Sequence, residues 1–153
     1  MHRHILIPTD GSELSVKSVD YGIALANAVG ARVTGITVLQ APNDEALADP
    51  TPLSGSGTST VVGYLKVISD AAAQAGVACD VLHVQHRHPY QAIIDTANDK
   101  GCDLIVMASH GRGRISAALL GSETFRVLAH STVPVLVFRG DRSSLFPSAL
   151  AGS

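Results

Sequence analysis

The stretch Asp103-Leu104-Ile105-Val106-Met107-Ala108 decides the fold, because it is a short apolar run that starts after one acidic residue and ends at a polar loop. Such a run is typical of a strand buried on both faces, as in parallel sheets that helices cover on either side. The segment that follows, Ser109-His110-Gly111-Arg112-Gly113-Arg114, is rich in the residue types that surround phosphate groups. The stretch therefore predicts an interior parallel strand with a candidate binding loop at its carboxyl end.

Short β-branched runs alternate with helical patterns along the rest of the chain. The other predicted strands cover residues 4–9, 32–39, 77–84 and 133–138. Pro134 places the last of them at an edge of the sheet. Predicted helices cover residues 13–29, 61–75, 89–100 and 122–130, the first of them capped by Ser12. This alternation predicts an α/β fold, namely a doubly wound five-stranded parallel sheet in the order 3-2-1-4-5 with four helices.

The chain of 153 residues fits one domain, which we expect to span residues 1–140. Within it, residues 41–60 are rich in Pro, Gly, Ser and Thr, and this composition predicts a long mobile loop. Residues 141–153 show no hydrophobic period, and we expect a disordered tail there.

Composition excludes several classes of function. The 11 basic and 13 acidic residues give a net charge of -2, and aromatic residues make up 4% with no Trp, which argues against a nucleic-acid partner. No apolar run reaches the roughly 18 residues of a membrane span, and the N-terminal residues do not resemble a signal peptide. Cys79 and Cys102 show no pairing pattern. We therefore expect a cytoplasmic protein without a membrane partner. Because charged residues make up only 16%, against about 25% in a typical domain, we also expect an oligomer interface.

The predicted topology places a ligand site where two polar loops meet. Doubly wound sheets bind ligands beyond the carboxyl ends of their strands, where the strand order reverses, which here is between the first and fourth strands. The segments Pro8-Thr9-Asp10-Gly11-Ser12 and Ser109-His110-Gly111 follow those strands. Gly121-Ser122 then begins a helix whose free N–H groups attract anions, and Ser122 either caps that helix or reaches a phosphate oxygen. Neither a P-loop nor a G-x-G-x-x-G fingerprint is present, which excludes an ordinary P-loop NTPase and disfavours a dinucleotide dehydrogenase.

These segments, together with the ending Ser131-Thr132-Val133-Pro134-Val135-Leu136-Val137, resemble the universal stress protein family. The resemblance covers residues 3–139 and is to a single-domain member of the nucleotide-binding branch. That branch carries the motif G-x-x-G-x9-G-S/T, which Gly111, Gly121 and Ser122 match. Ala108 stands at the position of the first glycine and departs from the motif.

The resemblance implies an adenine-nucleotide alpha-hydrolase-like fold and a cytoplasmic regulatory protein of the stress response that binds ATP with Mg²⁺. It also implies a homodimer that pairs through the last strand, which begins at Val133 and ends at Phe138, and an unknown protein partner. Adenosine would pack near the first two strands, and the phosphates would lie along the loop after the fourth. The implied binding residues are Pro8, Thr9, Asp10, Val38, Met107, Ser109, His110, Gly111, Arg112, Gly121 and Ser122.

Two alternative functions stay open. The Ala108 departure favours a stress module that dimerises without binding a nucleotide, because a Cβ there restricts close approach of the backbone. A slow ATP hydrolase on the same fold is the other, although no catalytic residue is evident and none is assigned. For the nucleotide-binding hypothesis, we expect Arg112, Arg114 and Arg126 to cluster near the phosphates.

The histidines allow two interpretations each. His110 either contacts phosphate or acts as an acid or base, or it fills its loop and forms local hydrogen bonds, which is the commoner case. His83, His86 and His88 have a spacing that suggests a metal site, but on a strand His83 and His86 point to opposite faces. We therefore assign no metal ligand to the chain.

Overall fold

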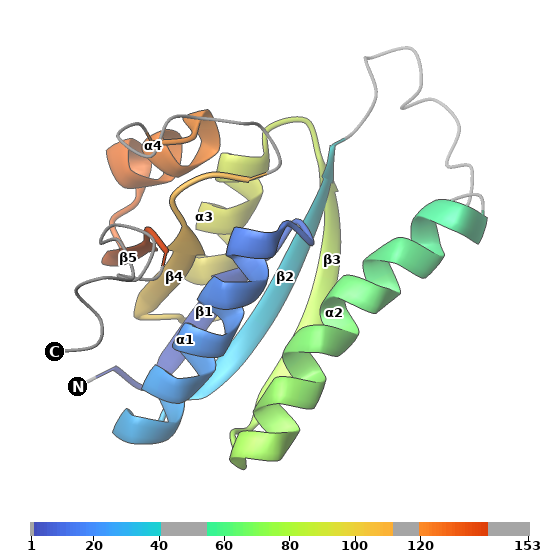
Figure 1. The fold of residues 1–153 in the computed structure, drawn as a ribbon. Helices are drawn as coiled ribbons and strands as arrows, with labels where there is room; N and C mark the ends of the chain where they lie inside the picture. Colours follow the sequence, from blue (N-terminus) through green and yellow to red (C-terminus); the bar gives the residue numbers. More distant parts are fainter. Residues whose placement is uncertain (1, 41–54, 112–119, 141–153) are drawn as a thin grey trace, which may run out of the picture.

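The computed structural model describes residues 2–40, 55–111 and 120–140. These residues form a parallel sheet with helices on both of its faces (Figure 1). The sheet has five strands in the order β3-β2-β1-β4-β5, and all neighbouring pairs are parallel. The α/β class and the strand order predicted from the sequence are thus confirmed. In chain order the elements are β1 (His4–Pro8), α1 (Glu13–Val29), β2 (Arg32–Gln40), α2 (Gly55–Ala75), β3 (Cys79–His86), α3 (Pro89–Asp99), β4 (Leu104–Ala108), α4 (Ser122–His130) and β5 (Val135–Phe138).

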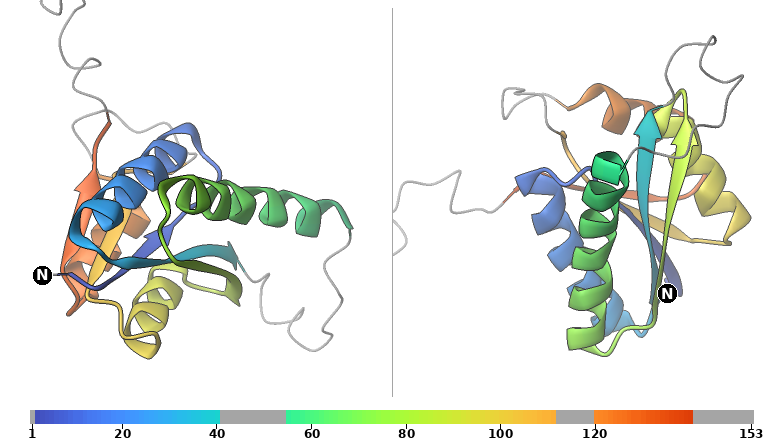
Figure 2. Two further views of the ribbon diagram at one scale, coloured as in Figure 1. Left: turned by 90° about the horizontal axis from the view of Figure 1, so that it is seen from below. Right: turned by 90° about the vertical axis from the view of Figure 1, so that its right-hand side faces the viewer.

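The sheet separates two halves of the hydrophobic core. Figure 2 shows α1 and α2 on one side of the sheet and α3 on the other. Ile5 and Ile7 of β1 pack on the side of α1 and α2, whereas Leu6 packs on the side of α3 and α4. Successive side chains of a strand alternate between its faces, so a strand with both faces covered buries all of them. Every residue of β4 is accordingly buried, which explains the unbroken apolar run from which its position was predicted.

The helix boundaries follow local capping chemistry. The Ser12 side chain accepts a hydrogen bond of 3.3 Å from the Ser15 N–H and caps α1, as predicted. Gly30 ends that helix in the left-handed conformation, with a φ of 74°. Pro89 opens α3, where the missing N–H of proline costs nothing.

Several predicted boundaries are wrong, among them the start of β5, which lies at Val135 rather than at residue 133, and the end of β3, which lies at His86 rather than at residue 84. The helix α2 begins at Gly55, so the predicted loop over residues 41–60 is too long at its C-terminal end. Gly, Ser and Thr are poor helix formers, but each costs at most about 1 kcal/mol, and a helix that is already nucleated can extend through them. The strand β3 begins at Cys79 rather than at residue 77, because the Val77 N–H still bonds to the Ala72 carbonyl at the end of α2 (2.8 Å).

Several predictions concern residues outside the described part of the chain, namely residues 41–54 of the predicted loop and the tail over 141–153. In the ranges that the structure does describe, no helix combines the length and the apolar character needed to cross a membrane.

Candidate functional site

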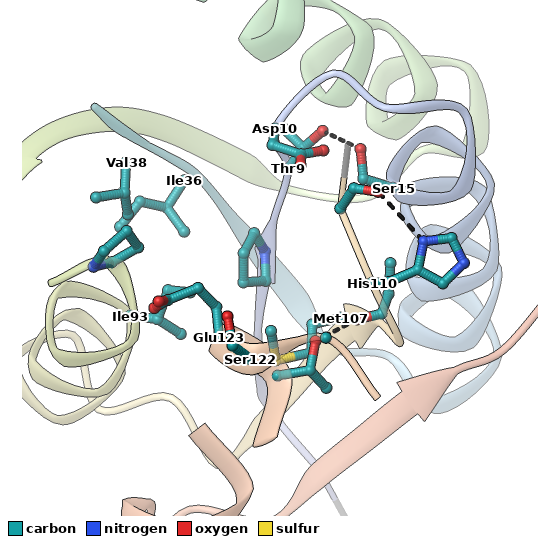
Figure 3. A pocket seen from close by; sticks show the side chains of 16 residues that line it. Thr9, Asp10, Ser15, Ile36, Val38, Ile93, Met107, His110, Ser122 and Glu123 are labelled. Carbon is teal, nitrogen blue, oxygen red and sulfur yellow. Dashed lines mark hydrogen bonds between the residues drawn. The ribbon is translucent and has the colours of Figure 1, made fainter. Parts of the chain in front are cut away.

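A pocket of about 350 Å³ opens at the carboxyl ends of β1 and β4, where the strand order reverses (Figure 3). Its position is the one that the doubly wound topology predicts. All but two of the predicted binding residues line it, and the exceptions are Ser109 and Arg112. Ser109 is buried and does not line the pocket, and Arg112 lies outside the described residues. The lining consists of Pro8, Thr9, Asp10, Ser15, Ile36, Val38, Pro89, Ile93, Met107, Ala108, His110, Gly111, Gly121, Ser122, Glu123 and Thr124.

Thr9 fixes the loop after β1 in place. Its N–H donates to the Ile36 carbonyl (2.9 Å), and its own carbonyl accepts from the Thr37 hydroxyl (3.0 Å). Its hydroxyl lies 3.0 Å from that of Ser15 on α1. Thr9 is therefore bonded to β2 and α1 at once and forms a rigid wall of the pocket.

Asp10 follows Thr9 and is oriented by the backbone of the next turn. Its Oδ1 accepts a hydrogen bond of 2.9 Å from the Ser12 N–H. Its Oδ2 lies against the backbone of Gly111, so that a Cβ at Gly111 would collide with it. The loops after β1 and β4 thus touch at this point, and glycine permits the contact because it has no side chain.

Gly121 makes a second close approach of backbone to backbone. Its N–H donates to the Ser109 carbonyl at 2.7 Å, and an added Cβ would lie 3.1 Å from the His110 Cα. This contact brings the start of α4 against the loop after β4. The residues that match the second and third positions of the family motif, Gly111 and Gly121, are therefore both sites where main chains pack closely.

The first turn of α4 is directed at the pocket. Gly121 is the N-cap residue and Ser122 the first helical residue, so the proposal that Ser122 caps the helix is wrong. Gly121 has no side chain with which to cap α4, and the leading N–H groups of a helix have no partners within it. These groups and the positive end of the helix dipole together favour an anion.

Ala108 ends β4 in the wall of the pocket and is buried. Its carbonyl accepts a hydrogen bond of 2.8 Å from the Thr124 hydroxyl, which anchors the first turn of α4 to the sheet. The alanine at this motif position is therefore accommodated by the fold as a buried residue of the pocket wall.

Arg126 does not join a phosphate cluster, contrary to the prediction. Its guanidinium lies 3.4 Å from Glu123 Oε1 and 5.7 Å from the centre of the Tyr90 ring, outside the pocket lining. Arg126 follows Glu123 by three residues on the helix, and this spacing allows the two side chains to pair. Arg112 and Arg114 belong to the undescribed segment.

The histidines form local contacts. His110 Nδ1 lies 3.2 Å from the Gly111 carbonyl. His86 Nδ1 accepts from the His88 N–H at 2.9 Å, and the two rings are 6.3 Å apart. Over the described ranges, no group of three or more His, Cys, Asp or Glu side chains is placed to hold a metal ion.

Sequence reasoning missed the wall of the pocket that α3 supplies. Pro89 and Ile93 line the pocket because α3 starts at the carboxyl end of β3. Figure 3 shows Glu123 of α4 beside Ile93. Ile36 could have been found, since it lies two residues before Val38 on the same face of β2. No local pattern indicates the contribution of α3, which depends on how the layers pack.

The strand order, the pocket at the switch point and the two closely packed glycines define the class, an α/β protein with the universal stress protein fold. The chain belongs to the universal stress protein family, whose model matches residues 1–139. The family resemblance found in the sequence is thereby confirmed.

Known relatives agree with this assignment. The chain is 32% identical over 140 residues to the universal stress protein in the QAH/OAS sulfhydrylase 3′ region of Thermus aquaticus, covering 91% of this chain and 100% of that protein. Its structure is similar to that of MJ0577 of Methanocaldococcus jannaschii, with a TM-score of 0.79, 27% identity and coverage of 90% and 96% of the two chains. It is also similar to a universal stress protein in complex with cAMP, with a TM-score of 0.68, 25% identity and coverage of 89% and 95%.

Proposed function

We propose that this chain binds ATP together with Mg²⁺ in the pocket between β1 and β4, and that it acts as a regulatory homodimer in the cytoplasmic stress response. The observation that carries the proposal is the joint presence of an apolar wall, two closely packed glycines and an open helix start in one pocket. The cAMP complex of a similar protein supports an adenine nucleotide as the ligand class.

The apolar wall suits the base of the nucleotide. Side chains from three strands and from α3 form it: Pro8, Ile36, Val38, Ile93 and Met107. A purine that leaves water for such a wall is stabilised by roughly 25 cal/mol for each Å² of apolar surface buried. The volume of about 350 Å³ falls within the roughly 300–1,000 Å³ that small-molecule pockets span.

The opposite side of the pocket suits the phosphates. The backbone around Gly111 and Gly121 and the first turn of α4 offer N–H groups, and the Ser122 hydroxyl lines the same wall. The Asp10 carboxylate would repel a phosphate, so we place it at the ribose hydroxyls, an exocyclic amine or a divalent cation. Mg²⁺ bound to the phosphates would neutralise part of their charge, and the Asp10 carboxylate could provide an oxygen ligand from the pocket lining.

The edge strand β5 supports the proposed dimer. All of its residues are half-buried, and its outer side has no neighbouring strand in the described sheet. An exposed apolar edge strand promotes pairing with another chain. We therefore place the dimer interface at residues 133–138, where two copies would join their sheets.

The cysteines are compatible with a reducing compartment. Cys79 and Cys102 are both free thiols. Burial raises the pKa of the Cys102 thiol to about 11, so that it stays protonated and unreactive at neutral pH. These thiols support the cytoplasmic location that we propose.

Two measurements test the nucleotide proposal. Protein that is purified without added nucleotide and then denatured should release an adenine nucleotide that mass spectrometry identifies. Mg-ATP should raise the melting temperature of the folded protein, because a ligand that binds only the native state stabilises it. If both measurements are negative, the alternative of a dimerisation module without nucleotide replaces the proposal.

A further inference from the structure

Glu123 joins the first turns of two helices at the rim of the pocket. It is the second residue of α4, and its Oε2 accepts a hydrogen bond of 2.8 Å from the N–H of Tyr90, the second residue of α3. Its Oε1 lies 3.4 Å from Arg126 Nη1. Figure 3 shows Glu123 beside Ile93 and Ser122 in the pocket wall. A single carboxylate therefore holds the two helices that flank the ligand space.

This contact makes the N-terminal ends of α3 and α4 differ in how well each can bind an anion. The cap residue of α3, His88, forms no side-chain cap, and the Glu123 carboxylate takes that place at the positive end of α3. The positive end of α3 is thus already matched by a protein anion. The cap residue of α4 is Gly121, so the start of α4 is the end that a ligand phosphate can use.

The same carboxylate places a negative charge where phosphates would arrive. Of the described residues that line the pocket, Asp10 and Glu123 are acidic, and none is Lys or Arg. Arg126 compensates Glu123 only from the solvent side, since both side chains are partly exposed and the pair is weakened by water. Among the described residues, each additional phosphate group would therefore meet the like charge of Glu123 with no Lys or Arg of the pocket lining beside it.

We propose that Glu123 determines how much phosphate charge the pocket accepts, so that it weakens the binding of ATP more than that of AMP and leaves adenosine unaffected. The inference rests on the proposed nucleotide site and adds its charge selectivity. The charge of Glu123 thus sets which nucleotides bind well. Its hydrogen bond to the Tyr90 N–H is a separate effect, which holds α3 and α4 in position.

The test separates charge from positioning by using Glu123→Gln. The amide oxygen of glutamine still accepts from the Tyr90 N–H, while the negative charge is lost. Adenosine, AMP and ATP are titrated into the wild type and the variant by calorimetry, without Mg²⁺ and at low salt. We expect adenosine affinity to stay the same, AMP affinity to rise about twofold and ATP affinity about fivefold, as for charges several ångströms apart near a protein surface.

The matched control is Glu13→Gln. Glu13 also lies in the first turn of a helix, is 89% exposed and faces Lys17 at 3.8 Å, but it does not line the pocket. We expect this variant to bind all three ligands like the wild type. Equal factors for adenosine, AMP and ATP in Glu123→Gln, or none, would overturn the inference, whereas a wild type that binds no ligand would instead refute the nucleotide site.

A second variant guards against misfolding of the first. Arg126→Gln removes the cation beside Glu123 and leaves its carboxylate in place. We expect ATP affinity to fall about threefold and adenosine affinity to stay unchanged. If Arg126→Gln instead leaves the ratio of ATP to adenosine affinity as in the wild type, the charge of Glu123 does not act on the phosphates.

Discussion

The backbone of Gly111 lies against the carboxylate of Asp10, so closely that a Cβ at Gly111 would meet Asp10 Oδ2. The two residues are far apart in the sequence and belong to the loops after β1 and β4. Their contact lies at the switch point of the sheet, between the ends of β1 and β4, and both residues line the pocket there. The position of Asp10 therefore depends on a residue that has no side chain.

This contact predicts that Gly111 and Asp10 are energetically coupled. In Gly111→Ala the new Cβ displaces the Asp10 carboxylate, which we propose to be a ligand contact, and ATP affinity should fall about tenfold, or about 1.4 kcal/mol. In an Asp10→Ala background there is no carboxylate to displace, and the same substitution should cost at most about threefold. A double-mutant cycle of dissociation constants measures the coupling. Additive effects would show that Gly111 acts independently of Asp10.

Ala108 allows a test between the nucleotide proposal and its alternative. Ala108→Gly restores the first glycine of the family motif and removes one methyl group from the pocket wall. We expect ATP affinity to rise by at most about threefold, because the wild type already binds, and the stability to fall by roughly 1 kcal/mol. Fluorescence competition with a labelled adenine nucleotide measures the affinity. Binding by the variant alone would favour a module that does not use nucleotide.

His4 predicts how stability depends on pH. Its Nε2 lies 2.6 Å from the Thr34 hydroxyl, which itself donates to Asp80 Oδ1 at 2.7 Å, so His4 is the donor in its own bond. Its Nδ1 is buried and has no hydrogen-bond partner in the described structure. Burial lowers the pKa of His4 below its ordinary value of 6.5, and the positive charge of Arg32 lowers it further.

Proton linkage decides whether the free energy of unfolding rises or falls with pH. Because the pKa is lower in the folded state, the unfolded chain binds more protons, and the free energy of unfolding falls as the pH drops below about 6.5 until the folded histidine is protonated as well. His4→Gln keeps an N–H donor toward Thr34 and should flatten this part of the profile. Urea unfolding at pH 5 to 8 provides the measurement, and a profile that is as steep in His4→Gln as in the wild type would exclude His4 as the cause.

From the open edge of β5 we predict that one substitution can separate the proposed dimer into monomers that stay folded. The carbonyls of Pro134 and Phe138 accept from β4, at 2.9 and 2.8 Å, so the alternating backbone directs the N–H groups of Val135 and Val137 to the open side. Val137→Pro removes one of these N–H groups without breaking the ladder to β4. Sedimentation velocity should show a wild-type dimer and a monomeric variant with a native circular dichroism spectrum. A variant that remains dimeric would place the interface elsewhere.

Much of the fold could be predicted because its signals are local. The cap at Ser12, the glycine after α1 and the apolar run of β4 each depend on a few neighbouring residues. The two loops of the site could also be predicted, because the carboxyl ends of parallel strands lie together once the strand order is known.

The remaining features depend on packing between elements. Pro89 and Ile93 line the pocket because α3 packs near the end of β3, which no sequence pattern records. Arg126 was predicted to lie near the phosphates, but its guanidinium instead contacts Glu123 and the Tyr90 ring. For Ser122 two roles were left open, and the role of helix cap is wrong, because Gly121 is the N-cap residue and Ser122 is the first helical residue.

Calorimetric titration of Mg-ATP into the wild type, Gly111→Ala and Gly63→Ala tests the central claim most directly. An added Cβ at Gly63 meets nothing within 4 Å, so this variant makes the same substitution without a steric effect and should only stabilise α2 by up to about 1 kcal/mol. We predict one saturable site per chain in the wild type and in Gly63→Ala, and binding about tenfold weaker in Gly111→Ala. No heat of binding in the wild type, or equal affinity in all three proteins, would contradict a nucleotide site at the junction of β1 and β4.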